Sequence, residues 1–154
     1  MQVRLATPED AVAACDVLRR SITELCEADH KNDPAFLARW LANKTPENVR
    51  AWIEGSSLYV AEEAGEIVGV AGLSNTGYIT LNYVAPNARF KGVTKALLNA
   101  VEQRAMELGC STCTLQSTKT AERFYRGAGY RELIGQPEGI LGKKLPPPDS
   151  SPPS

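Results

Sequence analysis

The 154-residue sequence lacks the features of membrane-spanning, disulfide-rich and polyanion-binding proteins. No window approaches the ~18 to 20 apolar residues that a transmembrane helix needs, and the N-terminus holds no apolar stretch of signal-peptide length. The 17 Lys and Arg residues are balanced by 18 Asp and Glu residues, so no basic excess is available to hold nucleic acid. The four cysteines are too few for a disulfide scaffold, and we expect them to be reduced. We therefore expect a cytoplasmic protein with no membrane or nucleic-acid partner.

Metal ligands are also scarce. The chain has one histidine, and its Cys-x-x-Cys pair, Cys110 and Cys113, straddles a predicted helix end and strand start. Structural zinc takes four ligands, and Cys15 belongs to an apolar helix face. The pair does not open a helix, so no helix dipole would lower the pKa of its thiols. The sequence predicts neither a metal site nor a redox centre.

The composition is that of a globular domain followed by a short tail. Apolar residues make up 43% of the chain and charged residues 23%, which is ordinary for a folded protein. We expect a single domain over residues 1–145. Residues 146–154 hold five prolines and three serines, which cannot bury enough apolar area to offset the entropy of ordering them. The sequence predicts that this tail is disordered.

Residues 1–56 carry three helix start signals, each a capping residue followed by proline. They are Thr7-Pro8, Asp33-Pro34 and Thr45-Pro46, and a strand over residues 3–6 precedes the first. After the first signal, apolar residues recur in steps of three and four, so the predicted helix buries one face. Those residues are Ala11, Cys15, Leu18, Ile22 and Leu25. The other two signals predict two short helices.

From residue 58 onward, strand patterns alternate with helix patterns. Runs rich in β-branched residues predict strands over 58–61, 67–71 and 78–84, the first two joined as a hairpin. Helical spacing predicts a long helix over 92–108 and a shorter one over 120–128. The pattern is completed by a strand over 112–116 between these helices and a final hairpin of residues 130–134 and 140–144.

The loop before the long helix is suited to binding a diphosphate. A helix start presents unpaired backbone N–H groups and the positive end of the macrodipole, and Gly92 leaves the approach open. Arg89, Lys91 and Lys95 add countercharge. Neither Gly-x-x-x-x-Gly-Lys-Ser/Thr nor Gly-x-Gly-x-x-Gly occurs, so the loop is neither a P-loop nor a dinucleotide fingerprint.

Two motifs resemble those of the GNAT superfamily of acyl-coenzyme A N-acyltransferases. Residues 89–94, Arg-Phe-Lys-Gly-Val-Thr, resemble its Arg/Gln-x-x-Gly-x-Gly/Ala signature, with Thr94 in place of the usual Gly or Ala. Residues 121–130 resemble its second motif, Ala-x-x-Phe-Tyr-x-x-x-Gly-Phe/Tyr. The resemblance implies an α/β (α+β) fold, in which helices flank a central mixed, mostly antiparallel sheet. The implied element order is β-α-α-β-β-β-α-β-α-β-β.

The resemblance also implies a site for acetyl-coenzyme A. In the family, two parallel strands splay apart after the position of Val84, and the freed backbone groups pair with the pantetheine arm. Tyr125 matches the family's tyrosine that protonates the leaving thiolate, so it is the expected general acid. Ser117 and Thr118 stand where many relatives have a pantetheine-binding Asn. The implied cofactor-binding residues are Asn82, Tyr83, Val84, Arg89, Phe90, Lys91, Gly92, Val93, Thr94, Lys95, Ser117 and Thr118.

The general base is missing from the strand where many relatives carry it. Candidates in the segment between the first helices are Glu24, Glu27, Asp29 and His30, acting as base or as substrate-binding residues. A histidine is attractive as a base because this residue type can change charge near neutral pH, but we expect His30 to be a solvent-exposed loop residue. The acidic residues would attract an amine, or simply form a solvated helix end.

The leading functional hypothesis is transfer of an acetyl group from acetyl-coenzyme A to a primary amine in a direct ternary complex. The acceptor is a small-molecule or protein amine. Alternatives are a noncatalytic acyl-coenzyme A binding or sensing module, and an interaction protein without a nucleotide-like ligand. Trp40 and Trp52 lie on apolar helical faces, as core residues or as the floor of an acceptor pocket. A homodimer is the expected oligomer, because twofold dimers are the commonest assemblies.

Overall fold

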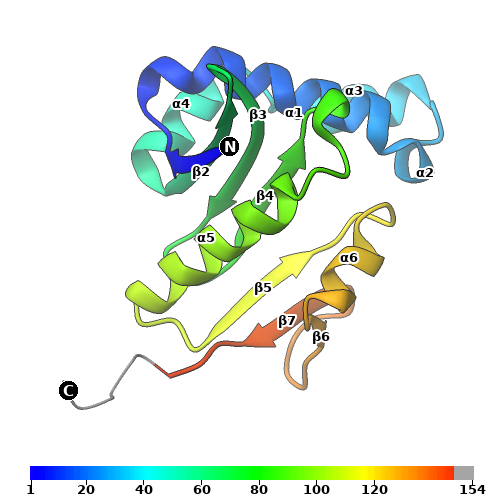
Figure 1. Ribbon diagram of the computed structural model, residues 1–154. Helices are drawn as coiled ribbons and strands as arrows, with labels where there is room; N and C mark the ends of the chain where they lie inside the picture. Colours follow the sequence, from blue (N-terminus) through cyan, green and yellow to red (C-terminus); the bar gives the residue numbers. More distant parts are fainter. Residues whose placement is uncertain (148–154) are drawn as a thin grey trace.

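Two antiparallel sheets form the centre of the protein in a computed structural model that describes residues 1–147 (Figure 1). The strand order is β1-β2-β3-β4 in the first sheet and β5-β7-β6 in the second. The strands are β1 (Gln2–Leu5), β2 (Ser57–Glu63), β3 (Glu66–Leu73), β4 (Ile79–Val84), β5 (Thr112–Gln116), β6 (Arg131–Glu132) and β7 (Ile140–Lys144). The helices are α1 (Ala11–Leu25), α2 (Glu27–His30), α3 (Pro34–Leu41), α4 (Pro46–Gly55), α5 (Val93–Glu107) and α6 (Glu122–Gly127), with 3-10 turns at Pro8–Asp10 and Pro86–Ala88.

The predicted helix starts are present, with one addition. Asp33 and Thr45 cap α3 and α4, because their side-chain oxygens accept hydrogen bonds from the backbone N–H groups of Ala35 and Asn48 at 3.0 and 3.2 Å. The Thr7-Pro8 signal first forms a 3-10 turn that leads into α1. Four helices therefore stand where the start signals predicted three and the resemblance implied two, and the unpredicted one is the single turn α2.

Helices cover both faces of the first sheet. In Figure 1, α1 and α4 lie on one side of it and α5 crosses the other. Residues 68–73 of β3 are all buried, as expected for a strand covered on both faces. A Cβ built on Gly69 would lie 2.6 Å from Val93 Cγ1 and 2.8 Å from Leu97 Cδ1. The glycine thus lets the first turns of α5 pack directly on the strand backbone.

Side chains of α5 link it to the second sheet. Glu102 of α5 accepts a hydrogen bond from the Tyr130 hydroxyl at 2.7 Å and pairs with Lys143 of β7 at 3.0 Å. Tyr130 is fully buried and Glu102 is 9% exposed. The predicted final hairpin is confirmed, with Arg131 opposite Gly142 in β7.

The two sheets meet at a single parallel bridge. Tyr78 is paired with Thr114, whose N–H donates to the Gly77 carbonyl at 3.0 Å. Beyond this bridge β4 and β5 diverge, so the expectation that they part only after Val84 is wrong. The turn after β5 is held by α2 instead, because Asp29 accepts a hydrogen bond from the Lys119 N–H at 2.7 Å. The mostly antiparallel sheet with flanking helices is confirmed, and its opening spans the whole of β4.

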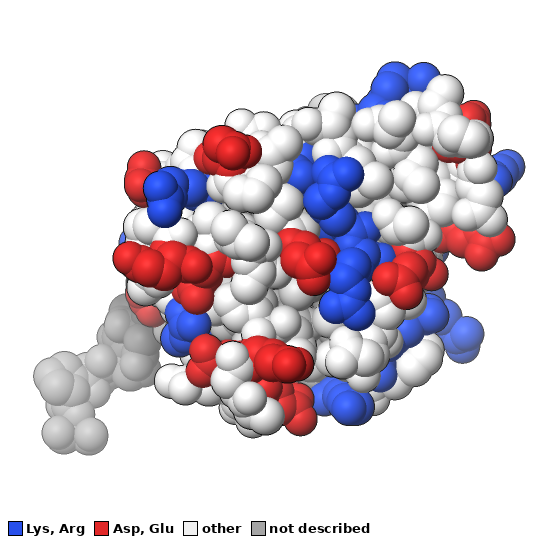
Figure 2. All heavy atoms as spheres, turned by 90° about the horizontal axis from the view of Figure 1, so that it is seen from above, with Lys and Arg blue, Asp and Glu red and all other residues white. Residues whose placement is uncertain are grey.

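The surface carries both signs of charge. Figure 2 shows Lys and Arg side chains interspersed with Asp and Glu on the face seen from above, with no broad area of one sign. No helix within residues 1–147 has the length and apolarity to cross a bilayer. Residues 148–154 lie outside the described residues, so the disorder expected for residues 146–154 stays a prediction.

Candidate functional site

A groove of about 460 Å³ lies between β4, the start of α5 and α6. We call it the α5 groove. The predicted cofactor-binding residues that line it are Asn82, Tyr83, Val84, Arg89, Phe90, Gly92, Val93, Thr94, Lys95 and Thr118, together with Tyr125. Lys91 and Ser117 do not line it. Residues in its lining that were not predicted are Ser21, Leu25, Cys26, Ala88, Thr120, Ala121 and Phe124.

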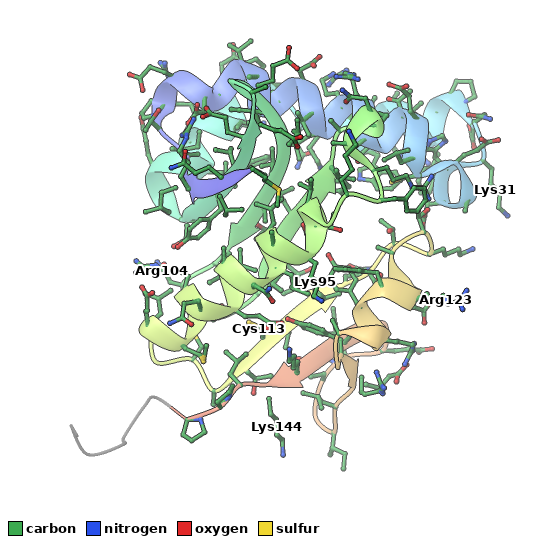
Figure 3. The ribbon with its side chains drawn as sticks, in the orientation of Figure 1. Lys31, Lys95, Arg104, Cys113, Arg123 and Lys144 are labelled. Carbon is green, nitrogen blue, oxygen red and sulfur yellow. The ribbon has the colours of Figure 1, made fainter. Side chains whose placement is uncertain are left out.

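The loop before α5 has the geometry of an anion site. Gly92 caps the helix with φ of 79°, and a Cβ added there would meet no atom within 4 Å. The first hydrogen bond of the helix runs from the Ala96 N–H to the Gly92 carbonyl at 3.0 Å, so the preceding amides have no partner in the helix. Arg89 and Lys95, which line the groove, add positive charge, and Figure 3 shows Lys95 on α5. A diphosphate fits this set of donors.

Phe90 occupies an unusual place in this loop. Its φ is 67°, in the left-handed region that non-glycine residues rarely adopt, and its side chain is 90% exposed. The Arg89 guanidinium lies 4.5 Å from the centre of its ring. The ring therefore stands at the outer rim of the α5 groove.

Asn82 supplies the clearest sign that a polar ligand belongs in the groove. Its side-chain nitrogen and oxygen are both buried and have no hydrogen-bond partner. Such orphaned groups are rare in folded proteins. The backbone of β4 also offers unpaired groups to the groove. The Ala85 N–H donates to the Val68 carbonyl of β3. Because N–H groups alternate in direction along a strand, those of Val84 and Asn82 face away from β3. A pantetheine arm with amide groups would match these donors and acceptors.

Tyr125 is placed at the inner end of the groove by α6. It is 6% exposed and packs edge-to-face against Phe124 and Tyr130, with ring centres 5.2 and 5.7 Å apart. Burial raises the pKa of Tyr125 to about 12, although the nearby Asn82 amide acts in the opposite direction. That amide lies close to the hydroxyl without reaching hydrogen-bond geometry. The hydroxyl therefore stays protonated at neutral pH and can donate a hydrogen bond.

Glu24 and Glu27 lie on the surface. They line neither the α5 groove nor the second cavity, which is described below. Glu24 is near Arg20, with 3.8 Å between the charged atoms, and Glu27 accepts a hydrogen bond from the Asn32 amide at 3.0 Å. The fold does not bring these two carboxylates to the predicted general acid.

His30 is buried, so the expectation of a solvent-exposed loop histidine is wrong. Its Nδ1 accepts a hydrogen bond from the Asn32 N–H at 3.0 Å, and its Nε2 faces the carbonyl oxygens of Ile22 and Thr23 at 3.0 and 3.2 Å. This pattern assigns the proton to Nε2 and the neutral form to the ring. The ring also packs edge-to-face on Trp40 at 6.3 Å. His30 thus joins α1, α2 and α3, with both nitrogens occupied.

Asp29 is the one base candidate that borders a cavity. Its carboxylate accepts hydrogen bonds from the N–H groups of Lys119 and Thr120 at 2.7 and 3.3 Å and from the Thr120 hydroxyl at 2.8 Å. These contacts anchor the turn that leads into α6. Three of its roughly four acceptor positions are occupied.

A second cavity, of about 490 Å³, adjoins the α5 groove; the two share Tyr83 and Thr118. We call it the aromatic cavity. Its lining consists of Asp29, Phe36, Arg39, Trp40, Tyr78, Tyr83, Gln116, Ser117 and Thr118. Trp40 therefore forms a cavity wall, whereas Trp52 packs against the core. No Asp, Glu or His within residues 1–147 lines the α5 groove itself.

Three of the lining residues that were not predicted come from α1 and the residue after it: Ser21, Leu25 and Cys26. Ser21 and Cys26 enter the α5 groove because α1 packs beside β4, and the helical pattern of α1 contains no mark of that contact. Burial raises the pKa of Cys26 to about 12, so its thiol stays protonated. Within residues 1–147 no cluster of three or more His, Cys, Asp or Glu side chains could hold a metal, and the expected absence of a metal stays a prediction.

Known proteins resemble this chain in sequence and in fold. A family model described as an acetyltransferase (GNAT) domain matches residues 26–140. The peptidyl-lysine N-acetyltransferase YiaC of Escherichia coli is 27% identical over 119 residues, covering 68% of this chain and 80% of that protein.

Two solved structures illustrate the likeness in fold. A GCN5-related N-acetyltransferase from Rhodopseudomonas palustris has a TM-score of 0.81 and 24% identity, covering 94% of this chain and 95% of its own. The PaiA N-acetyltransferase from Thermoplasma acidophilum, in complex with coenzyme A, has a TM-score of 0.77 and 18% identity, covering 94% and 100%. The family model spans most of the chain, and the fold and motifs agree with it. The chain therefore belongs to the GNAT family of acetyltransferases.

Proposed function

We propose that this protein transfers the acetyl group of acetyl-coenzyme A to a primary amine by direct attack of the amine on the thioester. The observation that carries the proposal is the opening between β4 and β5, which pair only at Tyr78 and Thr114. The unpartnered amide of Asn82 and the hydroxyl of Tyr125 both border this opening. The start of α5 lies beside it with its free amides.

The donor is held along the α5 groove. The amides at the start of α5 bind the diphosphate together with Arg89 and Lys95, as a helix N-terminus does for anions. Asn82 and the backbone of Val84 bind the pantetheine arm, because these groups face the groove without partners on β3. The thioester then lies near Tyr125 at the inner end.

The protein stabilises the negative charge that develops during transfer, first on the carbonyl oxygen and then on the leaving sulfur. The Val84 N–H, facing the groove, donates to the oxygen of the attacked carbonyl. Tyr125 donates a hydrogen bond to the sulfur as it leaves. The pKa of the Tyr125 hydroxyl, about 12, lies above that of a thiol, about 8.5. Tyr125 therefore keeps its own proton and stabilises the leaving sulfur by a hydrogen bond. The proton that the amine nitrogen loses passes to the sulfur or to solvent, and coenzyme A leaves as the thiol or thiolate.

Two further features favour direct transfer of the acetyl group. All four cysteines lie within the described residues, and only Cys26 lines the α5 groove. Its raised pKa keeps the thiol protonated, which makes it a poor nucleophile for an acyl-enzyme. No carboxylate or imidazole in the described part of the chain lines the groove, so the amine attacks in the neutral form in which it arrives.

The test combines binding with turnover. Coenzyme A is added in a thermal-shift assay, and acetyl-coenzyme A is then incubated with a panel of amines while free thiol is measured. The panel includes small amines, amino acids and a lysine peptide, since the Escherichia coli relative is named for peptidyl-lysine. A thermal shift with amine-dependent thiol release supports the proposal. A shift without release would identify a noncatalytic acyl-coenzyme A binding module, and no shift would overturn coenzyme A binding altogether.

A further inference from the structure

Arg39, an exposed residue of α3, is the positively charged side chain at the aromatic cavity. This side chain of α3 lines the cavity and forms no ion pair with any Asp or Glu within residues 1–147. Its guanidinium carbon lies 5.8 Å from the centre of the Phe36 ring. An unpaired guanidinium presents donors in a fork that matches a carboxylate.

The acidic residue of the same cavity is already satisfied. Asp29 accepts three hydrogen bonds from Lys119 and Thr120, which hold its charge against the turn before α6. Arg39 and Asp29 are the charged residues of the lining. A ligand in the cavity can therefore bind the guanidinium of Arg39, whereas most acceptor positions of the Asp29 carboxylate are already used by the protein.

The aromatic side chains of the lining pack on one another, beside the polar residues Gln116, Ser117 and Thr118. Phe36 packs edge-to-face on Trp40, with ring centres 6.1 Å apart, and remains 41% exposed. Trp40 is supported from behind by the buried ring of His30. Tyr78 and Tyr83 complete the aromatic lining. An exposed aromatic surface at a cavity is suited to an apolar ligand body.

We propose that the acceptor is an amine that also carries a carboxylate, with Arg39 binding the carboxylate and Phe36 and Trp40 packing on an apolar side chain. This inference rests on the proposed function, because the aromatic cavity reaches the α5 groove through Tyr83 and Thr118. The substrate class is that of hydrophobic amino acids acetylated at the α-amine. Polycationic acceptors are disfavoured by the like charge of Arg39.

The test measures kcat/KM with three amines of similar shape, L-phenylalanine, L-phenylalaninamide and phenethylamine. We expect L-phenylalanine to be preferred by about tenfold or more, the scale of one charge-assisted contact. The amide has the more acidic ammonium group and so a larger neutral fraction, which works against this preference. Arg39→Gln should remove the preference by lowering kcat/KM for L-phenylalanine alone, and Arg39→Lys should restore part of it.

A matched control separates the contact from general charge. Arg50 is an exposed arginine of α4 outside both cavities, so Arg50→Gln should leave all three values unchanged. Acetylation of the amines without a preference for the carboxylate would overturn this inference and leave the proposed function intact. A preference that survives Arg39→Gln would also overturn it. Thiol release with none of the amines of the wider panel would instead count against the proposed function.

Discussion

The side-chain amide of Asn82 is buried without a hydrogen-bond partner, which lowers the stability of the ligand-free protein and leaves the amide available to a ligand. An unsatisfied buried amide costs about 1–3 kcal/mol in a folded protein, and both polar atoms of this side chain lack partners. We expect Asn82→Ala to leave the unfolding free energy of the ligand-free protein unchanged or to raise it by up to ~1 kcal/mol. The same change should weaken coenzyme A binding by roughly fivefold to tenfold. Chemical denaturation and calorimetric titration measure the two effects.

The comparison for this variant is Asn99→Ala, on the exposed face of α5 outside the α5 groove. It should leave the affinity for coenzyme A unchanged. A clear loss of stability in Asn82→Ala without ligand would mean that the amide is satisfied by the protein itself.

Tyr125 contributes a single hydroxyl to the proposed reaction. Tyr125→Phe keeps the packing against Phe124 and Tyr130 but removes the donor to the leaving sulfur. We expect turnover to fall at least about tenfold, while the affinity for coenzyme A stays nearly the same. Steady-state kinetics with thiol detection measures the loss, and Tyr59→Phe, on β2 outside both cavities, serves as the control. Equal turnover would remove Tyr125 from the mechanism.

The dependence of the rate on pH follows from the same residues. No described carboxylate or imidazole lines the α5 groove, so kcat/KM should rise with pH up to the pKa of the acceptor amine. The functional form of Tyr125 is protonated, and its raised pKa of about 12 keeps that form present until strongly alkaline pH. A profile measured from pH 6 to 10 should therefore have a rising limb and no falling limb. A rise that ends near pH 5 to 7 with every amine would point to a protein base instead.

At the scale of elements, the start of α5 depends on one backbone conformation. Gly92 has φ of 79°, which any other residue adopts at a cost of about 1 kcal/mol. Gly92→Ala should lower the melting temperature by about 2–4 °C and weaken coenzyme A binding by about tenfold, because the added Cβ stands where the diphosphate approaches. Differential scanning calorimetry and titration measure both.

Gly55, at the end of α4, provides the matched substitution. A Cβ there also meets no atom within 4 Å, and its φ is not positive. Gly55→Ala should therefore leave stability unchanged or improve it, with no effect on binding. If both variants lost stability equally, backbone strain at Gly92 would not be the cause.

The elements themselves were predicted from local signals. Capping residues and prolines predicted the starts of α3 and α4, and helical spacing predicted the extent of α5, because these signals act within a few residues. The single turn α2 was missed, since Glu27–His30 carries no capping side chain. The exposure of His30 was misjudged for a different reason, because its burial comes from the packing of three helices.

At the scale of the whole molecule, buried thiols and phenols make stability depend on alkaline pH. Burial raises the pKa of Cys113 to about 11 and those of Cys26 and Tyr125 to about 12, and it raises the pKa of Tyr83 and Tyr130 as well. In the unfolded chain these groups ionise near pH 9 for cysteine and 10 for tyrosine. The folded protein then holds more protons than the unfolded one, so stability falls as pH rises.

The loss of folding stability is absent below about pH 8 and grows from about pH 9 to about pH 12. Each group contributes a slope of about 1.4 kcal/mol per pH unit between its unfolded and folded pKa. Urea unfolding at pH 7, 9, 10 and 11 measures the decline. Tyr130→Phe should reduce its slope above pH 10. A free energy of unfolding that stays constant up to pH 11 would show that these groups are not protected in the folded protein.

The helix starts, the strand runs, the loop before α5 and the two family motifs can be predicted from the sequence, because each depends on residues close together in the chain. Which side chains meet depends on how the helices and sheets pack. Asp29 contacts Lys119 and Thr120 across 90 and 91 residues, and this contact ties the turn after β5 to α2. Asp29, which was predicted as a base, therefore holds this turn. Arg39 is then the positively charged residue of the aromatic cavity, and it forms no ion pair within residues 1–147. Periodicity and spacing carry no information about contacts over such separations, since these arise only when helices and sheets pack together.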